Sequence, residues 1–160
     1  MDWEHLFHTQ NILDKHIAAN HQLAPEQLMD KKILALLVEV GELANETRCF
    51  KFWSNKQQSE KSVILEEYVD GLHFILSIGL DRSFSYESGA VASSSDITEQ
   101  FNRVFEQIIV LKRNPSKETY KELFDTYITL GYSLGFTEQD IMSSYDDKNK
   151  VNHQRQEQGY

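Results

Sequence analysis

The amino-acid sequence predicts an all-α protein, a helical bundle of about five to six helices. Apolar residues recur at helical spacing along several long stretches, and no useful length of chain shows the alternation of a β-strand. Both prolines, Pro25 and Pro115, stand just ahead of such helical stretches, where a proline is tolerated. With 160 residues the chain fits one domain, residues 1–160, that can bury a sizeable core.

The apolar spacing places the expected helices in order along the chain. They cover residues 2–20, 25–49, 59–80, 96–112, 116–134 and 137–156. Ser59 or Ser62 is expected to cap the third of them. Thr137 with Asp140 resembles a capping box for the last helix, with Asp in place of the usual Glu. The serine-rich residues 82–95 are expected to form a loop.

Composition and charge narrow the class of protein. The net charge of -9 argues against duplex nucleic acid as a partner, because that partner needs a basic surface; a single nucleotide is still compatible. Cys49 is the only cysteine, so the chain can form no internal disulfide, which suits a reducing compartment. Residues 1–7 do not resemble a secretory signal, and no apolar run approaches the ~20 residues of a membrane span. We therefore expect a soluble, cytoplasmic protein with no membrane partner.

The most informative segment is the acidic stretch that begins at Glu39. Glu39, Glu42 and Glu46 are three or four residues apart, so a helix places them on one face with ~5–6 Å between Cβ atoms. A stripe of like charge is destabilising unless it is solvated, paired with a base or neutralised by a cation. Taken alone, such a stripe is most often a solvated helix face.

A second acidic pair, Glu67 and Asp70, repeats this geometry in the middle of an apolar helix. Two antiparallel helices would bring both pairs together and place four carboxylates around one cavity. Oxygen-only ligands suit hard divalent cations such as Mg²⁺ or Mn²⁺, and Mg²⁺ usually holds substrate phosphates through carboxylates. The alternative is a set of buried salt bridges with Arg48 or Lys51. A ferritin-like di-iron site is disfavoured, because the sequence lacks the required Glu-x-x-His pairs.

A basic group follows near the C-terminus. Lys148, Asn152 and Arg155 are four and three residues apart, which places them on one face of the last expected helix. Arginine supplies a bidentate fork and lysine a point charge, and both can complete a phosphate site beside divalent cations. The alternative is an ordinary solvated basic tail.

Several other residues have both a structural and a functional interpretation. Phe50 and Trp53 can be core residues or a wall on which a base stacks. His73 alone is more often a core histidine than a ligand, although its ring can bond a uracil edge or hold a carboxylate. Gly41 and Gly71 lie inside expected helices, where glycine costs ~1 kcal/mol relative to alanine. Close approach of another helix or of substrate would explain both glycines.

Four motifs occur in order along the chain: Glu39-Val-Gly-Glu42, Phe50-Lys-Phe-Trp53, Glu67-Tyr-Val-Asp70-Gly-Leu-His73-Phe74, and Lys148-Asn149-x-x-Asn152-x-x-Arg155-Gln156-x-x-Gly159-Tyr160. Together they resemble the dimeric, all-α dUTPase family, part of the MazG-like all-α NTP pyrophosphohydrolases. The acidic pairs are shared by that whole superfamily, whereas the aromatic, Leu-His-Phe and C-terminal motifs are more specific to the dUTPase branch. The resemblance covers residues 10–160.

The resemblance implies a homodimer that hydrolyses dUTP, and dUDP as well, to dUMP. It implies two or more Mg²⁺ ions (with Mn²⁺ as a substitute) held by four carboxylates, those of Glu39, Glu42, Glu67 and Asp70. Glu42, or else Glu39, would orient or deprotonate the attacking water. The residues implied in substrate binding are Gln10, Asp14, Lys51, Trp53, His73, Phe74, Lys148, Asn149, Asn152, Arg155 and Tyr160. The family often has Asn where this chain has Asp14.

Two alternative functions stay open at the level of sequence. The first is a pyrophosphohydrolase of the same fold that acts on dCTP or on a modified nucleotide, because only the pocket around the base would differ. The second is a module that binds nucleotide, metal or a partner protein without turnover. The intact carboxylate pairs and the basic tail argue against this second alternative.

Overall fold

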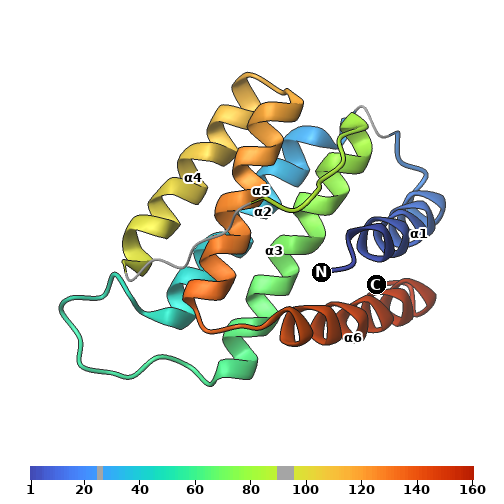
Figure 1. The fold of residues 1–160 in the computed structure, drawn as a ribbon. Helices are drawn as coiled ribbons and strands as arrows, with labels where there is room; N and C mark the ends of the chain where they lie inside the picture. The colour runs from blue at the N-terminus through green and yellow to red at the C-terminus, as the bar shows by residue number, and fades with distance from the viewer. Residues whose placement is uncertain (25–26, 90–95) are drawn as a thin grey trace.

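In a computed structural model, the described residues (1–24, 27–89 and 96–160) form six α-helices and no strand, which confirms the all-α prediction (Figure 1). The helices are α1 Trp3–His21, α2 Met29–Thr47, α3 Lys61–Arg82, α4 Ile97–Arg113, α5 Lys117–Ser133 and α6 Glu138–Glu157. The expected helix start at Pro25 and the last residues of the expected serine-rich loop, 90–95, lie outside the described residues. Within the described part, no helix is long and apolar enough to cross a membrane.

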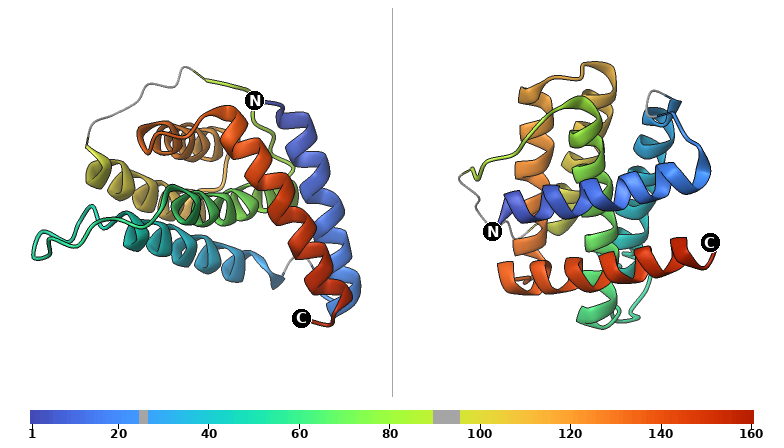
Figure 2. Two further views of the ribbon diagram at one scale, coloured as in Figure 1. Left: turned by 90° about the horizontal axis from the view of Figure 1, so that it is seen from below. Right: turned by 90° about the vertical axis from the view of Figure 1, so that its right-hand side faces the viewer.

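The helices form two layers that cross each other. The pairs α2/α3 and α4/α5 make one bundle, and α1 and α6 lie side by side across its face (Figure 2). Helices α1 and α6 run in the same direction, because His5 bonds Asp146 and His16 bonds His153, each at 2.9 Å. Helix α3 packs against α1, α2, α5 and α6 and is therefore the central element of the fold.

Helix ends follow local sequence at most positions. The side chains of Asp2 and Asp96 accept backbone hydrogen bonds at the starts of α1 and α4 and so cap these helices. Thr137 and Asp140 form the predicted capping box of α6. The prediction for α3 was wrong: Glu60 occupies the N-cap position without a side-chain cap, so neither serine fills that role. The Ser59 hydroxyl instead donates to the Glu46 carboxylate, and a charged acceptor makes the stronger hydrogen bond.

Two tyrosines join α3 to α5 through reciprocal hydrogen bonds. The Tyr68 hydroxyl donates to the carbonyl of Tyr127 at 3.0 Å, and the Tyr127 hydroxyl donates to the carbonyl of Tyr68 at 2.7 Å. The rings stack with centroids 4.6 Å apart. A Cβ atom at Gly71 would collide with the Tyr127 hydroxyl, so this glycine permits the close approach that its position in the sequence suggested.

Gly41 differs from Gly71 in its surroundings. A Cβ atom built at Gly41 meets no atom of the described residues within 4 Å. The idea that another helix of the same chain packs closely against Gly41 was therefore wrong.

These two glycines give a matched test of the packing. Gly71→Ala is expected to lower the free energy of unfolding by roughly 1–3 kcal/mol, because the new methyl group displaces the Tyr127 hydroxyl. Gly41→Ala is expected to raise it by about 0.5–1 kcal/mol, because alanine favours the helix and meets open space. Urea unfolding of the metal-free variants measures both. Equal effects of the two substitutions would contradict the close α3–α5 packing.

Candidate functional site

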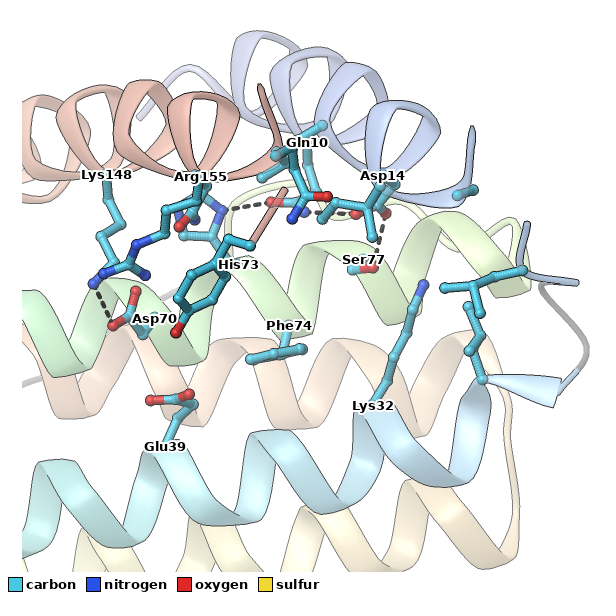
Figure 3. Close-up of a pocket in the computed structure, with 18 residues that line it drawn as sticks. Gln10, Asp14, Lys32, Glu39, Asp70, His73, Phe74, Ser77, Lys148 and Arg155 are labelled. Carbon is cyan, nitrogen blue, oxygen red and sulfur yellow. Dashed lines mark hydrogen bonds and ion pairs between the residues drawn. The ribbon is translucent and has the colours of Figure 1, made fainter. Parts of the chain in front are cut away.

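Helices α1, α2, α3 and α6 enclose a cavity of about 420 Å³ (Figure 3). That volume falls within the ~300–1,000 Å³ range of sites that hold small molecules. One end carries Glu39, Asp70 and Lys148, and the other carries the Asp14 carboxylate and Lys32 beside amide, imidazole and hydroxyl groups, with Phe74 between the two ends. The polar and charged residues that line it are Gln10, Asp14, Lys32, Glu39, Asp70, His73, Ser77, Lys148, Asn152, Arg155, Gln156 and Tyr160.

Three carboxylates meet at the acidic end. Glu39 comes from α2, and Glu67 and Asp70 come from α3, with one oxygen of each lying within 4.8 Å of the others. Glu67 and Asp70 share a helix face because they are three residues apart. The packing of α2 against α3 then brings Glu39 to them. The structure thus joins one member of the first acidic pair to both members of the second.

Glu42 stands outside this group of three but is close enough to act on it electrostatically. Burial raises the pKa of Glu39 to about 7, and the charges of Asp70 and Glu42 add to the effect. Burial likewise raises the pKa of Glu67, again helped by Asp70 and Glu42. Negative charge is therefore concentrated where water is partly excluded, and this arrangement favours a hard divalent cation with oxygen ligands.

Lys148 is the basic partner of the acidic end. Its ammonium lies 2.7 Å from Asp70 and 2.8 Å from Glu66, and its side chain is only 12% exposed. The sequence had suggested Arg48 or Lys51 for such salt bridges, but Arg48 donates to Ser54 and to a backbone carbonyl, and Lys51 donates to Asn45. Within residues 1–24, 27–89 and 96–160 no salt bridge reaches Glu39 or Glu67, so the residues present fit a bound cation.

A hydrogen-bonded network occupies the other end of the cavity. The Gln10 side chain lies 2.7 Å from His73 Nδ1 and 2.8 Å from Asp14, and the Ser77 hydroxyl donates to Asp14 at 2.7 Å. The Tyr145 hydroxyl donates to Gln10 at 2.7 Å. Ser77 and Tyr145 are not among the site residues predicted from the sequence. The position of Ser77 one helical turn after His73 is the signal that could have indicated it.

The predicted C-terminal residues divide into two groups. Asn152, Arg155 and Tyr160 line the cavity, and the Arg155 guanidinium lies 5.2 Å from the centre of the Tyr160 ring. Asn149 is buried and does not line the cavity, and its Oδ1 atom has no hydrogen-bond partner in the part of the chain that the structure describes. Phe74 of α3 lines the cavity between its two ends.

Lys51 and Trp53 lie outside the cavity of their own chain. They belong to residues 48–60, which join α2 to α3 and project away from α1 and α6 (Figure 1). Trp53 is 64% exposed and packs edge-on against Phe50 and Phe52. Neither the core nor the base-wall interpretation of Trp53 is realised within one chain.

The family profile described as dUTPase matches residues 2–160, almost the entire chain. The chain belongs to the dUTPase family. No curated protein sequence matches it significantly. As a dUTPase it is a hydrolase that acts on dUTP, a nucleoside triphosphate diphosphatase, and the acidic group of this dUTPase could bind the metal ion on which such enzymes generally depend.

The raised pKa of Glu39 predicts how the stability of the metal-free dUTPase depends on pH. Between the ordinary glutamate pKa of 4.5 and about 7, the folded protein binds more protons than the unfolded chain. The free energy of unfolding should therefore fall as pH rises through this window. Urea unfolding at a series of pH values measures the slope.

Glu39→Gln should reduce this slope, because glutamine carries no titrating proton. The control is Glu122→Gln, which changes an exposed glutamate of α5. An unchanged slope in Glu39→Gln would show that Glu39 does not titrate in this range.

Proposed function

We propose that this dUTPase holds two or more Mg²⁺ ions through Glu39, Glu42, Glu67 and Asp70 and hydrolyses dUTP, and also dUDP, to dUMP. Mn²⁺ would serve in place of Mg²⁺. The observation that carries the proposal is the group of three carboxylates from two helices at one end of a nucleotide-sized cavity. When bound, such cations neutralise phosphate charge and make water more acidic.

Glu42 is our choice for the residue that takes the proton of the attacking water. It stands outside the tight group of three carboxylates, so it is less committed to holding a cation. It is nevertheless close enough to raise the pKa of Glu39 and Glu67. Glu39 is the second choice, because it belongs to the same acidic pair on α2 but lies inside the group of three carboxylates.

The basic residues of α6 would bind the phosphates. Arg155 can offer two parallel hydrogen bonds to one phosphate group, and Lys148 offers a point charge beside Asp70. Asn152, Asn149 and Tyr160 would complete the contact from the same helix and its C-terminal end. All of these residues except Asn149 line the cavity together with Glu39 and Asp70, which supports their assignment to the phosphates.

The polar end would receive the deoxyuridine part of the substrate. Gln10, Asp14 and His73 supply donors and acceptors there, and Phe74 offers an aromatic surface. A base-sized group would thus lie between α1 and α3, with its phosphates directed along the cavity toward Glu39 and Lys148. We place this activity in the cytoplasm.

A homodimer would give a role to residues 48–60. Phe52 is 94% exposed and Trp53 64%, an unusual exposure for large apolar side chains, and Leu34 and Val38 of α2 are also exposed. We propose that these surfaces meet a second copy of the chain. Lys51 and Trp53 would then contact the nucleotide bound by the partner rather than that bound by their own protomer.

The purified protein with Mg²⁺ should release pyrophosphate from dUTP in preference to dCTP and other nucleotides.

Glu42→Gln should lower kcat by roughly 100- to 10,000-fold, because it removes the general base. Glu46→Gln is the matched control, since Glu46 follows by one turn and bonds Ser59 instead. An unchanged kcat in Glu42→Gln would refute the role of Glu42. Failure of the wild type to hydrolyse any nucleotide would favour a binding module.

Mixing two defective variants tests whether the site is shared. Glu67→Gln lacks a ligand carboxylate, and Trp53→Ala lacks the exposed aromatic group, so each alone should have low kcat/KM for dUTP. If Trp53 serves the partner, each mixed dimer contains one fully normal site, and an equimolar mixture should regain about a quarter of wild-type activity. No recovery above the average of the two variants would show that Trp53 does not act across a dimer.

A further inference from the structure

The orientation of the Gln10 amide is set by its partner on α1. An ionised carboxylate can only accept hydrogen bonds, and the other oxygen of Asp14 already accepts one from Ser77 at 2.7 Å. The group that Gln10 turns toward Asp14, at 2.8 Å, must therefore be its NH₂. Gln10 consequently turns its oxygen, Oε1, away from Asp14 and toward α3 and α6.

The oxygen of Gln10 in turn decides which nitrogen of His73 carries hydrogen. Oε1 accepts from the Tyr145 hydroxyl and lies 2.7 Å from His73 Nδ1. Because Oε1 is an acceptor, Nδ1 must be the N–H donor. Burial lowers the pKa of His73 to about 3, so the ring is neutral at physiological pH. The other nitrogen, Nε2, is then a bare acceptor.

His73 Nε2 is buried and has no hydrogen-bond partner among the described residues. Such an acceptor is costly unless something donates to it. The His73 ring lines the cavity together with Gln10, Asp14 and Ser77 (Figure 3). Tyr145 stacks on the same ring, with centroids 4.2 Å apart, but does not itself line the cavity. A ligand that brings an N–H to His73 would satisfy the unpaired nitrogen.

We propose that Ser77, Asp14, Gln10 and Tyr145 hold His73 in the form whose Nε2 accepts the N–H of an imide base, and so select uracil over cytosine. Ser77 and Tyr145 are positioning residues in this arrangement, because they act through Asp14, Gln10 and the imidazole. The inference rests on the proposed assignment of this end of the cavity to the base.

Uracil and cytosine differ at N3, the ring atom that would face His73 Nε2. Uracil carries a hydrogen on N3 between two carbonyl groups, whereas N3 of cytosine is itself an acceptor. Cytosine would set one lone pair against another at His73 Nε2. A site whose buried polar groups require a particular hydrogen bond rejects a ligand that cannot make it. Thymine shares the imide edge, so this arrangement reads the edge and not the substituent at C5.

Nitrogen-15 NMR of the histidine rings tests the arrangement without any turnover. The signal of His73, identified by its loss in His73→Gln, should show Nδ1 protonated and Nε2 bare at neutral pH. Adding dUMP should shift Nε2 in the direction of an accepted hydrogen bond, and adding dCMP should not. A protonated Nε2, or an Nε2 signal that dUMP leaves unchanged, would overturn the inference.

This measurement separates the two proposals. If dUMP shifts Nε2 but the enzyme shows no preference for dUTP in turnover, the proposed function fails and the tautomer assignment stands. If dUTP is hydrolysed preferentially while Nε2 is unaffected by dUMP, the tautomer assignment fails and the proposed function stands.

Tyr145→Phe tests the positioning role. Loss of one hydroxyl donor to Gln10 should raise KM for dUTP and lower the preference for dUTP over dCTP roughly tenfold, with kcat largely retained. Tyr120→Phe is the matched control, because Tyr120 is equally buried and donates to the carbonyl of Ile75 away from the cavity. An equal loss of preference in both variants, or an unchanged preference in folded Tyr145→Phe, would refute the role of Tyr145.

Discussion

The reciprocal hydrogen bonds between Tyr68 and Tyr127 fix the position of α3, on which the rest of the molecule depends. Both hydroxyls are fully buried, so a shift of one helix along the other would leave two donors without acceptors. Gly71 supplies the space for this contact. Helix α3 carries acidic residues, His73 and Ser77 on the surface that faces α1, α2 and α6. The tyrosine pair therefore sets the register of both ends of the cavity at once.

The acidic end is stable only in balance with positive charge. Burial raises the pKa values of Glu39, Glu67 and Asp70, which means that their ionised forms are disfavoured in the folded protein. Lys148 offsets part of this cost by pairing with Asp70 and Glu66. A cation would offset more, and in the proposed function it would leave the Lys148 ammonium free to contact the substrate phosphates. The same concentration of charge that weakens the fold suits the site to a cation and a triphosphate.

Much of the site could be predicted because it is built from residues that lie within one or two turns of each other on the same helix. The pairing of Glu67 with Asp70 follows from helix geometry alone, and so does the shared face of Lys148, Asn152 and Arg155. Contacts between helices were harder to predict. The partner of Lys148 lies 78 residues away, and the partner of His73 lies 63 residues away. Helical spacing cannot predict contacts between residues so far apart in the sequence, because these contacts depend on how the apolar faces of different helices pack together.

The sequence by itself determined the helices, the capping box of α6 and the residue types that suit a cation and a nucleotide, because these depend on neighbours within one or two turns. Tertiary structure decided which carboxylates meet and that Gln10 joins His73, Asp14 and Tyr145 in one network. It also decided that Trp53 lies outside its own cavity. The physical reason is that helix formation is governed by local hydrogen bonds, whereas the approach of one helix to another is governed by side-chain packing over the entire chain.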